Sequence, residues 1–518
     1  MALSKQNPTN LNSWLRLDEQ FKIEFDSHIS SFFEEESRLQ EFTISWEDFY
    51  LDFSKNRLSS KTFNLLIDLC KETDLKNNIE KYFNGSAINE TENRSVLHTA
   101  LRSSQVKNNK LKIEIESTLD KIISISDNIN NGKQLGYTGK KITDIVNIGI
   151  GGSHLGPEMV TEALSFYSLG IKPHFISNID SDFTSNLLEK LNPETTLFII
   201  VSKTFTTIET LENSKKIKKW FIENANLESI KDHFIAVSNN HEAPKEFGIS
   251  SDNILAIPEW VGGRFSLWGS VGLIISIIIG SKNFKEFLGG AESMDLHFRN
   301  SPFEQNIPVV LALVSIWYNN FFNCETEAVL PYNQFLGKLP DYLQQASMES
   351  NGKSVDRDGN KINYETGSIV WGSTGTNAQH AFFQLMHQGT KIIPSDFIAF
   401  KKSLYGDDFQ HDILTSNFLA QTNALMIGKN STGSEIHKNI EGNKPSNSLV
   451  INKLTPSSLG ALISMYENKI FTIGSILNIY SYDQWGVELG KSIARDISKG
   501  IRDNLDKSTR KISDILKR

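Results

Sequence analysis

The stretch FIIVSKTFTT (residues 198–207) decides the fold of this chain. Its apolar beginning is typical of a strand that is buried on both faces of a parallel sheet. Hydroxyl and lysine side chains follow, and then ETLENS (209–214), which indicates a helix start. In α/β proteins ligands bind beyond the carboxyl ends of strands, and a helix N-terminus there favours a phosphate. The alternative is a capping turn that is merely rich in Ser and Thr.

A second loop has the same layout of strand, turn and helix. The sequence NIGIGGSHLGP (147–157) ends a predicted strand and leads into a predicted helix. A dinucleotide-binding loop would have the spacing GxGxxG, but His154 stands where the third glycine would be. The loop also lacks the GKS/T ending of a nucleotide P-loop. A small phosphorylated ligand therefore fits this glycine loop better than a dinucleotide does.

Composition limits the class of protein. The chain has 518 residues, enough for two or three domains, and 39% hydrophobic residues, enough for a large core. A net charge of −8 argues against a general nucleic-acid binder. The chain has two distant cysteines and a polar N-terminus, which favour a cytoplasmic protein. Its most apolar segment (265–280) is too short to span a bilayer, so no membrane segment is expected.

The predicted elements alternate between strand and helix in two regions. The first region, residues 120–285, carries predicted strands at 142–150, 174–179, 197–201, 234–238 and 254–257. The second, residues 286–480, carries them at 325–330, 369–372, 391–400 and 449–451. This alternation predicts parallel, doubly wound α/β sheets.

The two ends of the chain are predicted to be helical. Residues 1–119 show helical periodicity and no strong strand signal. Within them, His98 and Arg102 are interpreted as part of a surface helix with its own ion pairs. The tail, residues 481–518, is predicted to end in one amphipathic helix in which Ile493, Ile497, Ile501 and Leu505 repeat.

Several polar residues are candidates for catalysis. Arg264 follows a glycine pair and precedes a buried helix, so it is either a structural ion-pair partner or a group that faces developing negative charge. Glu349 ends a predicted helical run and is either a cap or a general base. His380 and His387 are seven residues apart, not four, which favours acid–base chemistry or core packing and no metal.

Several motifs together resemble the glucose-6-phosphate isomerase family. The two most specific are VGGRFSLWGS (261–270) and YDQWGVELGK (482–491), and the two loops above, MESNGKSV (348–355) and TNAQHAFFQLMHQGT (376–390) support them. The resemblance implies two sugar-isomerase (SIS) domains, each a doubly wound parallel sheet in an αβα sandwich. It implies interconversion of glucose 6-phosphate and fructose 6-phosphate, in glycolysis and gluconeogenesis, by a homodimer without metal or cofactor.

The resemblance also implies roles for residues in the matching motifs. Glu349 would move a proton between carbons 1 and 2, Arg264 would stabilise the enediolate, and His380 and Lys491 would shuttle protons during ring opening. The histidine would be supplied across the dimer interface. The residues implied to hold the sugar and its phosphate are Gly152, Ser153, Ser202, Lys203, Thr204, Thr207, Gln345 and Gln484.

The chain departs from the family pattern at a few positions. His154 and Ala346-Ser347 stand where Asp and Gly-Asp are common, and Ser373-Thr374 and Ala378 replace a usual Glu-Pro and Gly. None of these departures removes an implied catalytic residue. The alternatives are a sugar-phosphate sensor without catalysis, an isomerase that also accepts mannose 6-phosphate, and a dinucleotide oxidoreductase, which the glycine spacing disfavours.

Overall fold

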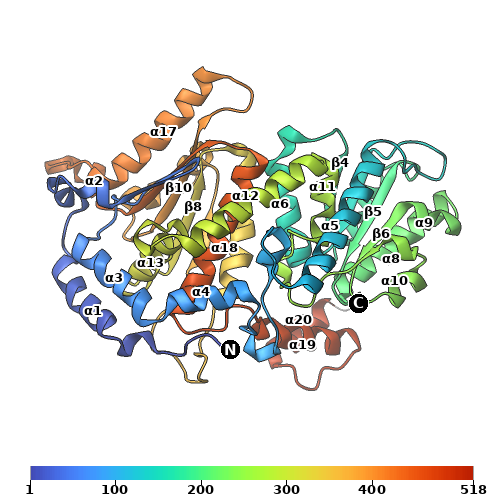
Figure 1. Cartoon of the computed structure of the whole chain (residues 1–518), viewed down its shortest axis with the longest axis horizontal. Coiled ribbons are helices and arrows are strands. Elements are labelled where there is room, and N and C mark those ends of the chain that lie inside the picture. Colours follow the sequence, from blue (N-terminus) through green and yellow to red (C-terminus); the bar gives the residue numbers. More distant parts are fainter. Residues whose placement is uncertain (1, 517–518) are drawn as a thin grey trace. The chain divides into compact units, whose positions relative to one another are not determined.

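The computed structural model describes residues 2–516, and these form two compact units. The first unit runs to Ser481 and the second begins at Tyr482. The four regions expected from the sequence (1–119, 120–285, 286–480 and 481–518) stay a prediction. The first unit contains two sheets with helices packed around them (Figure 1).

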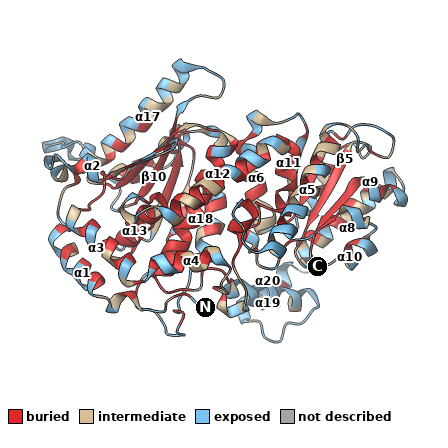
Figure 2. Ribbon diagram, in the orientation of Figure 1, coloured by how far each residue is buried: buried red, intermediate tan, exposed pale blue. Residues whose placement is uncertain are grey.

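The first sheet is parallel and has the strand order β4-β3-β5-β6-β7. Its strands are β3 (Asp144–Ile148), β4 (Lys172–Ile176), β5 (Thr196–Val201), β6 (Phe234–Val237) and β7 (Ile254–Leu255). All five lie where the sequence predicts strands. The central strand β5 is buried along its whole length (Figure 2), as its apolar sequence requires.

Helices cover both faces of this sheet, with α5 and α11 on one face and α8 on the other (Figure 1). Phe198 of β5, Phe234 of β6 and Phe221 of α8 pack together in the core on the α8 side. The helices of this region are α5 (Asn109–Asn130), α6 (Leu155–Ala163), α7 (Ser181–Leu188), α8 (Ile208–Asn224), α9 (Ile230–His233), α10 (Glu242–Phe247) and α11 (Leu273–Ile279).

The second sheet has the order β1-β2-β11-β10-β8-β9. Four of its strands are parallel and confirm the sequence prediction: β8 (Thr326–Pro331), β9 (Ile369–Gly372), β10 (Ser395–Lys402) and β11 (Ser446–Lys453). The other two form a hairpin, β1 (Thr43–Trp46) and β2 (Phe49–Asp52), which adds antiparallel to β11. The N-terminal region is therefore mainly helical, but it also supplies an edge of this sheet.

Helix α18 (Pro456–Ile476) is buried over nearly its whole length (Figure 2). It packs closely on α12 (Ser281–Asn300). Only a glycine fits at residue 460, since a Cβ there would lie 2.0 Å from the carbonyl oxygen of Phe287 in α12. The remaining helices of the first unit are α1 (Asn12–Glu24), α2 (Arg38–Glu41), α3 (Ser60–Glu72), α4 (Leu75–Asn84), α13 (Ile307–Asn320), α14 (Leu339–Leu343), α15 (Gly375–Gln379), α16 (Phe383–Gln388) and α17 (Asp408–Ile427).

Two expectations about the ends of the chain are wrong. His98 and Arg102 lie in a short 3-10 helix, His98–Arg102, and both side chains are buried. The His98 ring bonds to the Tyr82 hydroxyl, and Arg102 bonds to Asp295 and Glu467, on helices far along the chain. The tail forms two helices, α19 (Glu488–Ser498) and α20 (Lys507–Leu516), instead of one. Gly500 has φ +82°, a left-handed conformation that ends the first of them.

Candidate active site

The glycine loop and the hydroxyl loop lie next to each other at one edge of the first sheet. They follow β3 and β5, which are neighbouring strands paired through Ile148 and Ile200. A Cβ at Gly149 would lie 3.1 Å from the carbonyl oxygen of Val201, so the two loops begin in direct contact. The chain passes from β3 to β4 on one side and then to β5 on the other, which makes this edge the topological switch point where α/β proteins bind ligands.

The hydroxyl loop leaves the start of helix α8 open. Thr207 is the residue before the helix, yet its side chain does not cap the helix; its hydroxyl accepts a hydrogen bond from Ser202, at 3.1 Å. The N–H groups of the first turn of α8 therefore have no cap from this side chain and can bind an anion. Among the described residues, the Ser153 hydroxyl of the glycine loop has no hydrogen-bond partner, so it too is available.

Lys203 connects the hydroxyl loop to the segment that carries Arg264. Its ammonium donates to the carbonyl oxygens of Glu259 and Val261, at 3.1 and 3.0 Å. Burial lowers the pKa of Lys203. The side chain of Lys203 is therefore occupied by these carbonyls, and the exposed pair Thr204 and Thr206, whose hydroxyls are 2.6 Å apart, follows it in the loop.

The Arg264 turn touches the glycine loop through backbone atoms. A Cβ at Gly152 would lie 2.1 Å from the carbonyl oxygen of Gly263, so only glycine permits this contact. Arg264 is 4% exposed, and Ser350, Ser481 and Glu349 are among the partners of its guanidinium. Nε donates to Ser350 Oγ at 2.7 Å, Nη2 donates to the carbonyl oxygen of Ser481 at 2.8 Å, and Nη1 lies 3.3 Å from Glu349 Oε2.

Glu349 ends a π-helical turn, Gln344–Glu349, that continues directly from α14. Such turns in proteins are frequently found at functional sites. The carboxylate pairs with Arg264 on one side and accepts a hydrogen bond from Gln345 Nε2, at 3.1 Å, on the other. Gln345 also faces the glycine loop, since a Cβ at Gly151 would lie 3.0 Å from its Nε2. Five of the predicted site residues are thus brought together: Gly152, Ser153, Arg264, Gln345 and Glu349.

His380 is separate from this group. It lies just after α15 with an exposed imidazole, and within the described part of the chain that ring makes no hydrogen bond to Glu349 or Arg264. Lys491 lies in α19, where its ammonium is 2.9 Å from Glu488 Oε1. Gln484 and Lys491 belong to the second compact unit, and their part in the site stays a prediction.

The sequence alone does not predict the residues that hold Arg264 in place. Ser350 could have been suspected because it follows Glu349, but Ser481 contributes a backbone carbonyl and gives no sequence signal. The departure at His154 also finds an explanation. Its Nε2 lies 3.1 Å from Glu158 Oε2, and this contact, acting against burial, lowers the pKa of Glu158. The histidine, which directly precedes α6, therefore pairs with a glutamate in the first turn of that helix.

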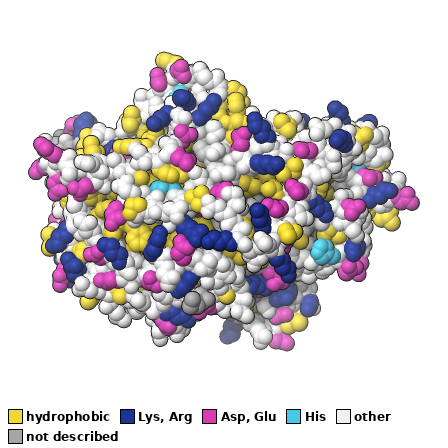
Figure 3. All heavy atoms as spheres, in the orientation of Figure 1, with side chains coloured by type: hydrophobic (Ala, Val, Ile, Leu, Met, Phe, Trp, Pro, Cys, Tyr) yellow, Lys and Arg dark blue, Asp and Glu magenta, His cyan; other side chains and the backbone are white. Residues whose placement is uncertain are grey.

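Residues 2–516 contain neither a metal-binding cluster nor a membrane-spanning helix. No group of three or more His, Cys, Asp or Glu side chains is placed to hold a metal ion. No helix in this part of the chain is long and apolar enough to cross a membrane. On the face drawn in Figure 3, acidic and basic side chains are interspersed, which differs from the continuous basic surface of a nucleic-acid binder.

Fold and site together define an α/β protein of the sugar-isomerase type, with a carboxylate–arginine pair beside the glycine loop and the hydroxyl loop. The family model for phosphoglucose isomerase matches residues 52–514, most of the chain. The chain belongs to the phosphoglucose isomerase family.

Several relatives match this chain over nearly its full length. Glucose-6-phosphate isomerase of Christiangramia forsetii is 52% identical over 533 residues, covering 98% of this chain and 98% of that protein. The protein of the same name from Blochmanniella floridana is 50% identical over 524 residues, covering 95% and 94%. The crystal structure of a glucose-6-phosphate isomerase from Chlamydia trachomatis superposes with a TM-score of 0.87 at 30% identity and covers 99% of this chain and 100% of that chain.

Proposed function

We infer that this chain is a glucose-6-phosphate isomerase, which interconverts glucose 6-phosphate and fructose 6-phosphate. The observation that carries the inference is the pair of Glu349 and buried Arg264 beside the two loops. A base, a cation fixed beside it and a phosphate cradle are what an aldose–ketose isomerisation needs. The relatives named glucose-6-phosphate isomerase, which match this chain over nearly its full length, support it.

In the proposed mechanism Glu349 is the general base. Its carboxylate takes the proton from carbon 2 of the open-chain aldose. The electrons of that C–H bond form a double bond between carbons 1 and 2, and the carbonyl oxygen takes the negative charge. Arg264 stabilises this enediolate, because its guanidinium is already oriented by Ser350 and Ser481. Return of the proton to carbon 1 and transfer of the hydroxyl proton from oxygen 2 to oxygen 1 give the ketose.

The phosphate is proposed to bind where the two loops meet. The open first turn of α8 and the hydroxyls of Ser153, Ser202, Thr204 and Thr207 supply neutral donors. Gly152 and the backbone of Lys203 complete the cradle. Gln345 and Gln484 orient the sugar and its phosphate.

We propose that the active enzyme is a cytoplasmic homodimer in which His380 serves the partner's site. The support is that His380 is exposed and makes no hydrogen bond to Glu349 within the described residues of its own chain. An imidazole has a pKa near working pH and is suited to move the proton during ring opening. Lys491 assists it in this proposal.

The first experiment compares the unaltered protein with Glu349→Gln in a coupled assay of fructose 6-phosphate conversion. The substitution keeps the size of the side chain but removes the base, so we expect kcat to fall by about 10² to 10⁴ while sugar-phosphate binding persists. Glu325→Gln, at an exposed glutamate, is the control and should stay active. An unaltered protein that binds the sugar phosphate but does not convert it would be a sensor, and an active Glu349→Gln variant would place the base elsewhere.

A further inference from the structure

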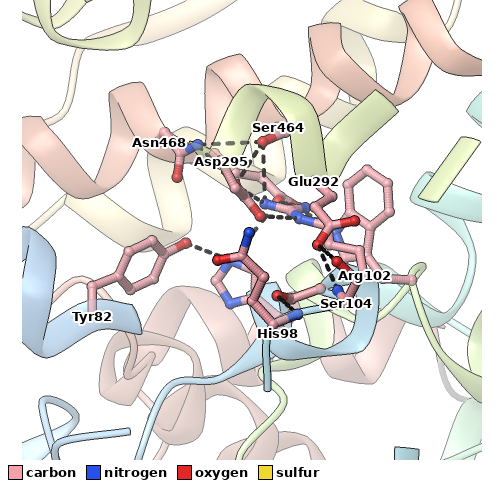
Figure 4. Close-up of polar contacts among 12 residues, drawn as sticks. Tyr82, His98, Arg102, Ser104, Glu292, Asp295, Ser464 and Asn468 are labelled. Atoms are coloured by element: carbon pink, nitrogen blue, oxygen red, sulfur yellow. Dashed lines mark hydrogen bonds and ion pairs between the residues drawn. The ribbon is translucent and has the colours of Figure 1, made fainter. Parts of the chain in front are cut away.

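A buried polar cluster lies behind the Arg264–Glu349 pair, and none of its members has a part in the mechanism above. We define it as Arg102, Asp295 and Glu467 together with Trp268 and Tyr342, all 5% exposed or less. They come from five separate parts of the sequence. Figure 4 shows Arg102 facing Asp295, with Ser464 and Asn468 of α18 around the same carboxylate. A charged cluster this deep in the core is expensive to bury unless every group is paired.

Arg102 is held firmly within this cluster. Its Nε and Nη2 donate to the two carboxylate oxygens of Asp295, at 2.7 and 2.8 Å, and its Nη1 donates to Glu467 Oε2 at 2.5 Å. Its guanidinium lies 4.3 Å from the centre of the Trp268 ring. Against the effect of burial, Asp295 and Glu467 raise the pKa of Arg102, so it stays charged. Arg102 therefore fixes one oxygen of the Glu467 carboxylate in place.

The other oxygen of Glu467 connects the two halves of the active site. Oε1 accepts one hydrogen bond from Trp268 Nε1, at 2.9 Å, and another from the Tyr342 hydroxyl, at 3.2 Å. Trp268 follows Arg264 by four residues in the same turn segment. Tyr342 lies in α14, which continues directly into the π-helical turn that ends at Glu349. One buried oxygen atom thus accepts hydrogen bonds from both segments, the one that carries Arg264 and the one that leads to Glu349.

A stacked pair of rings supports the same arrangement from the side of Arg264. The imidazole of His98 stacks on the ring of Phe265, with centroids 4.6 Å apart and an interplanar angle of 13°. Phe265 is the neighbour of Arg264 in the chain. The Tyr82 hydroxyl lies 2.7 Å from His98 Nε2 and fixes that imidazole in turn. The short helix His98–Arg102 therefore contacts the Arg264 segment through His98 and the Glu467 carboxylate through Arg102.

We propose that Glu467 is a positioning residue that sets the distance between Arg264 and Glu349. The proposal rests on the proposed function, because it concerns the geometry of that site. Glu467 does not touch the substrate. Through its hydrogen bonds to Trp268 and Tyr342 it fixes the position of Arg264 relative to Glu349. Arg102 in turn fixes the position of Glu467. In a preorganised site a displacement of 1 Å can cost about 10² in rate, so loss of either bond should slow catalysis without weakening phosphate binding.

The test removes single donors and leaves the charged groups in the core, since a variant at Glu467 itself would leave Arg102 short of a partner. Tyr342→Phe deletes only the hydroxyl, and Trp268→Phe removes the indole N–H. The matched control is Tyr318→Phe, which deletes another buried tyrosine hydroxyl, one that accepts a hydrogen bond from the Arg57 N–H far from the pair. For each protein kcat, KM for fructose 6-phosphate and the thermal midpoint are measured.

We expect Tyr342→Phe and Trp268→Phe each to lower kcat by roughly tenfold, with KM changed less than about twofold. The control should lose thermal stability to a similar degree and keep its kcat. Because both donors act through one oxygen, the double variant should lose little more kcat than the worse single variant.

Two results would overturn the proposal. In the first, Tyr342→Phe has the kcat of the unaltered enzyme. In the second, the two losses multiply in the double variant, which would mean that each substitution acts separately. Failure of the proposed function is distinguishable, because in that case the unaltered protein itself does not convert fructose 6-phosphate.

Discussion

Arg264 illustrates how much one side chain can contribute when its geometry is fixed. Its Nε, Nη2 and Nη1 contact Ser350, Ser481 and Glu349 in turn, so the carboxylate is one partner among several. A lysine has a single nitrogen at the end of a flexible stem and cannot reproduce this fork. The orientation of the positive charge therefore depends on the identity of the residue as well as on its charge.

At the residue scale we predict that Arg264→Lys retains the charge and loses most of the activity. An ammonium cannot meet Ser350, Ser481 and Glu349 together, so it will not lie where the enediolate forms. We expect kcat to fall by about 10² or more, with KM affected less. Steady-state kinetics check this, with exposed Arg16→Lys as the control. A variant with unaltered kcat would remove Arg264 from the proposed role.

Residues also show what local sequence can and cannot predict. The glycine loop and the hydroxyl loop were recognisable because their signals are contiguous in the chain. The burial of Arg102 was not, because Asp295 lies 193 residues and Glu467 lies 365 residues away in sequence. A polar residue in a short helical pattern reads as a surface residue unless such distant partners are known. Glu349 stayed ambiguous for the same reason, since its pairing with Arg264 is a tertiary contact.

At the scale of elements, His297 joins the end of α12 to the start of α13. Its Nε2 accepts a hydrogen bond from the Ile307 N–H, at 3.1 Å, and its Nδ1 lies 2.9 Å from Ser301 Oγ. Protonation of Nε2 would break the first of these bonds. Burial lowers the pKa of His297 from 6.5 to about 4, which agrees with an imidazole that stays neutral in the folded protein.

This predicts an acid-sensitive helix junction. Below pH 6.5 the unfolded chain binds a proton at His297, whereas the folded chain binds it only near pH 4. The free energy of unfolding therefore falls as the pH is lowered from 6.5 to 4. At pH 5 the loss from this residue is about 2 kcal/mol. His297→Gln can still accept from Ile307 and cannot titrate, so its thermal midpoint should fall less between pH 7.5 and pH 5. The exposed His241→Gln control should follow the unaltered protein, and identical pH dependence in all three would contradict the prediction.

Elements differed in how readily the sequence revealed them. The five strands of the first sheet were predictable because short apolar runs alternate with helical segments. The four parallel strands of the second sheet had weaker signals, because polar residues stand at their ends. Strands β1 and β2 were not predictable, because each has only four residues. They become strands by pairing with each other and, for β2, with β11, which lies about 400 residues later in the chain. In the tail a repeat of every fourth residue ran past Gly500, and the positive φ of that glycine, which periodicity does not reveal, divides the helix.

At the scale of the whole molecule, the site proposed here needs a second copy of the chain. In a dimer with two-fold symmetry each site would combine Glu349 of one copy with His380 of the other. A dimer of one Glu349→Gln chain and one His380→Gln chain then contains one site with both defects and one site with none.

We predict that such mixed dimers recover about half of the activity of the unaltered dimer. Each variant carries a different affinity tag, so that mixed dimers can be purified and assayed beside the two parent variants, which should both be nearly inactive. Recovery would demonstrate that the site is shared. A mixed dimer as inactive as its parents would show that Glu349 and His380 serve the site of their own chain, or that no dimer is required.

The contact between Gly152 and the Gly263 carbonyl has a consequence for how this site can change over generations. The two segments meet through main-chain atoms, and a Cβ on one side would overlap the other. As long as residue 152 stays glycine, substitutions at other positions leave this main-chain contact in place, so the spacing between the glycine loop and the arginine turn is retained. Substrate preference can then change through substitutions around the sugar, while the distance from the phosphate to the reacting carbon stays constant.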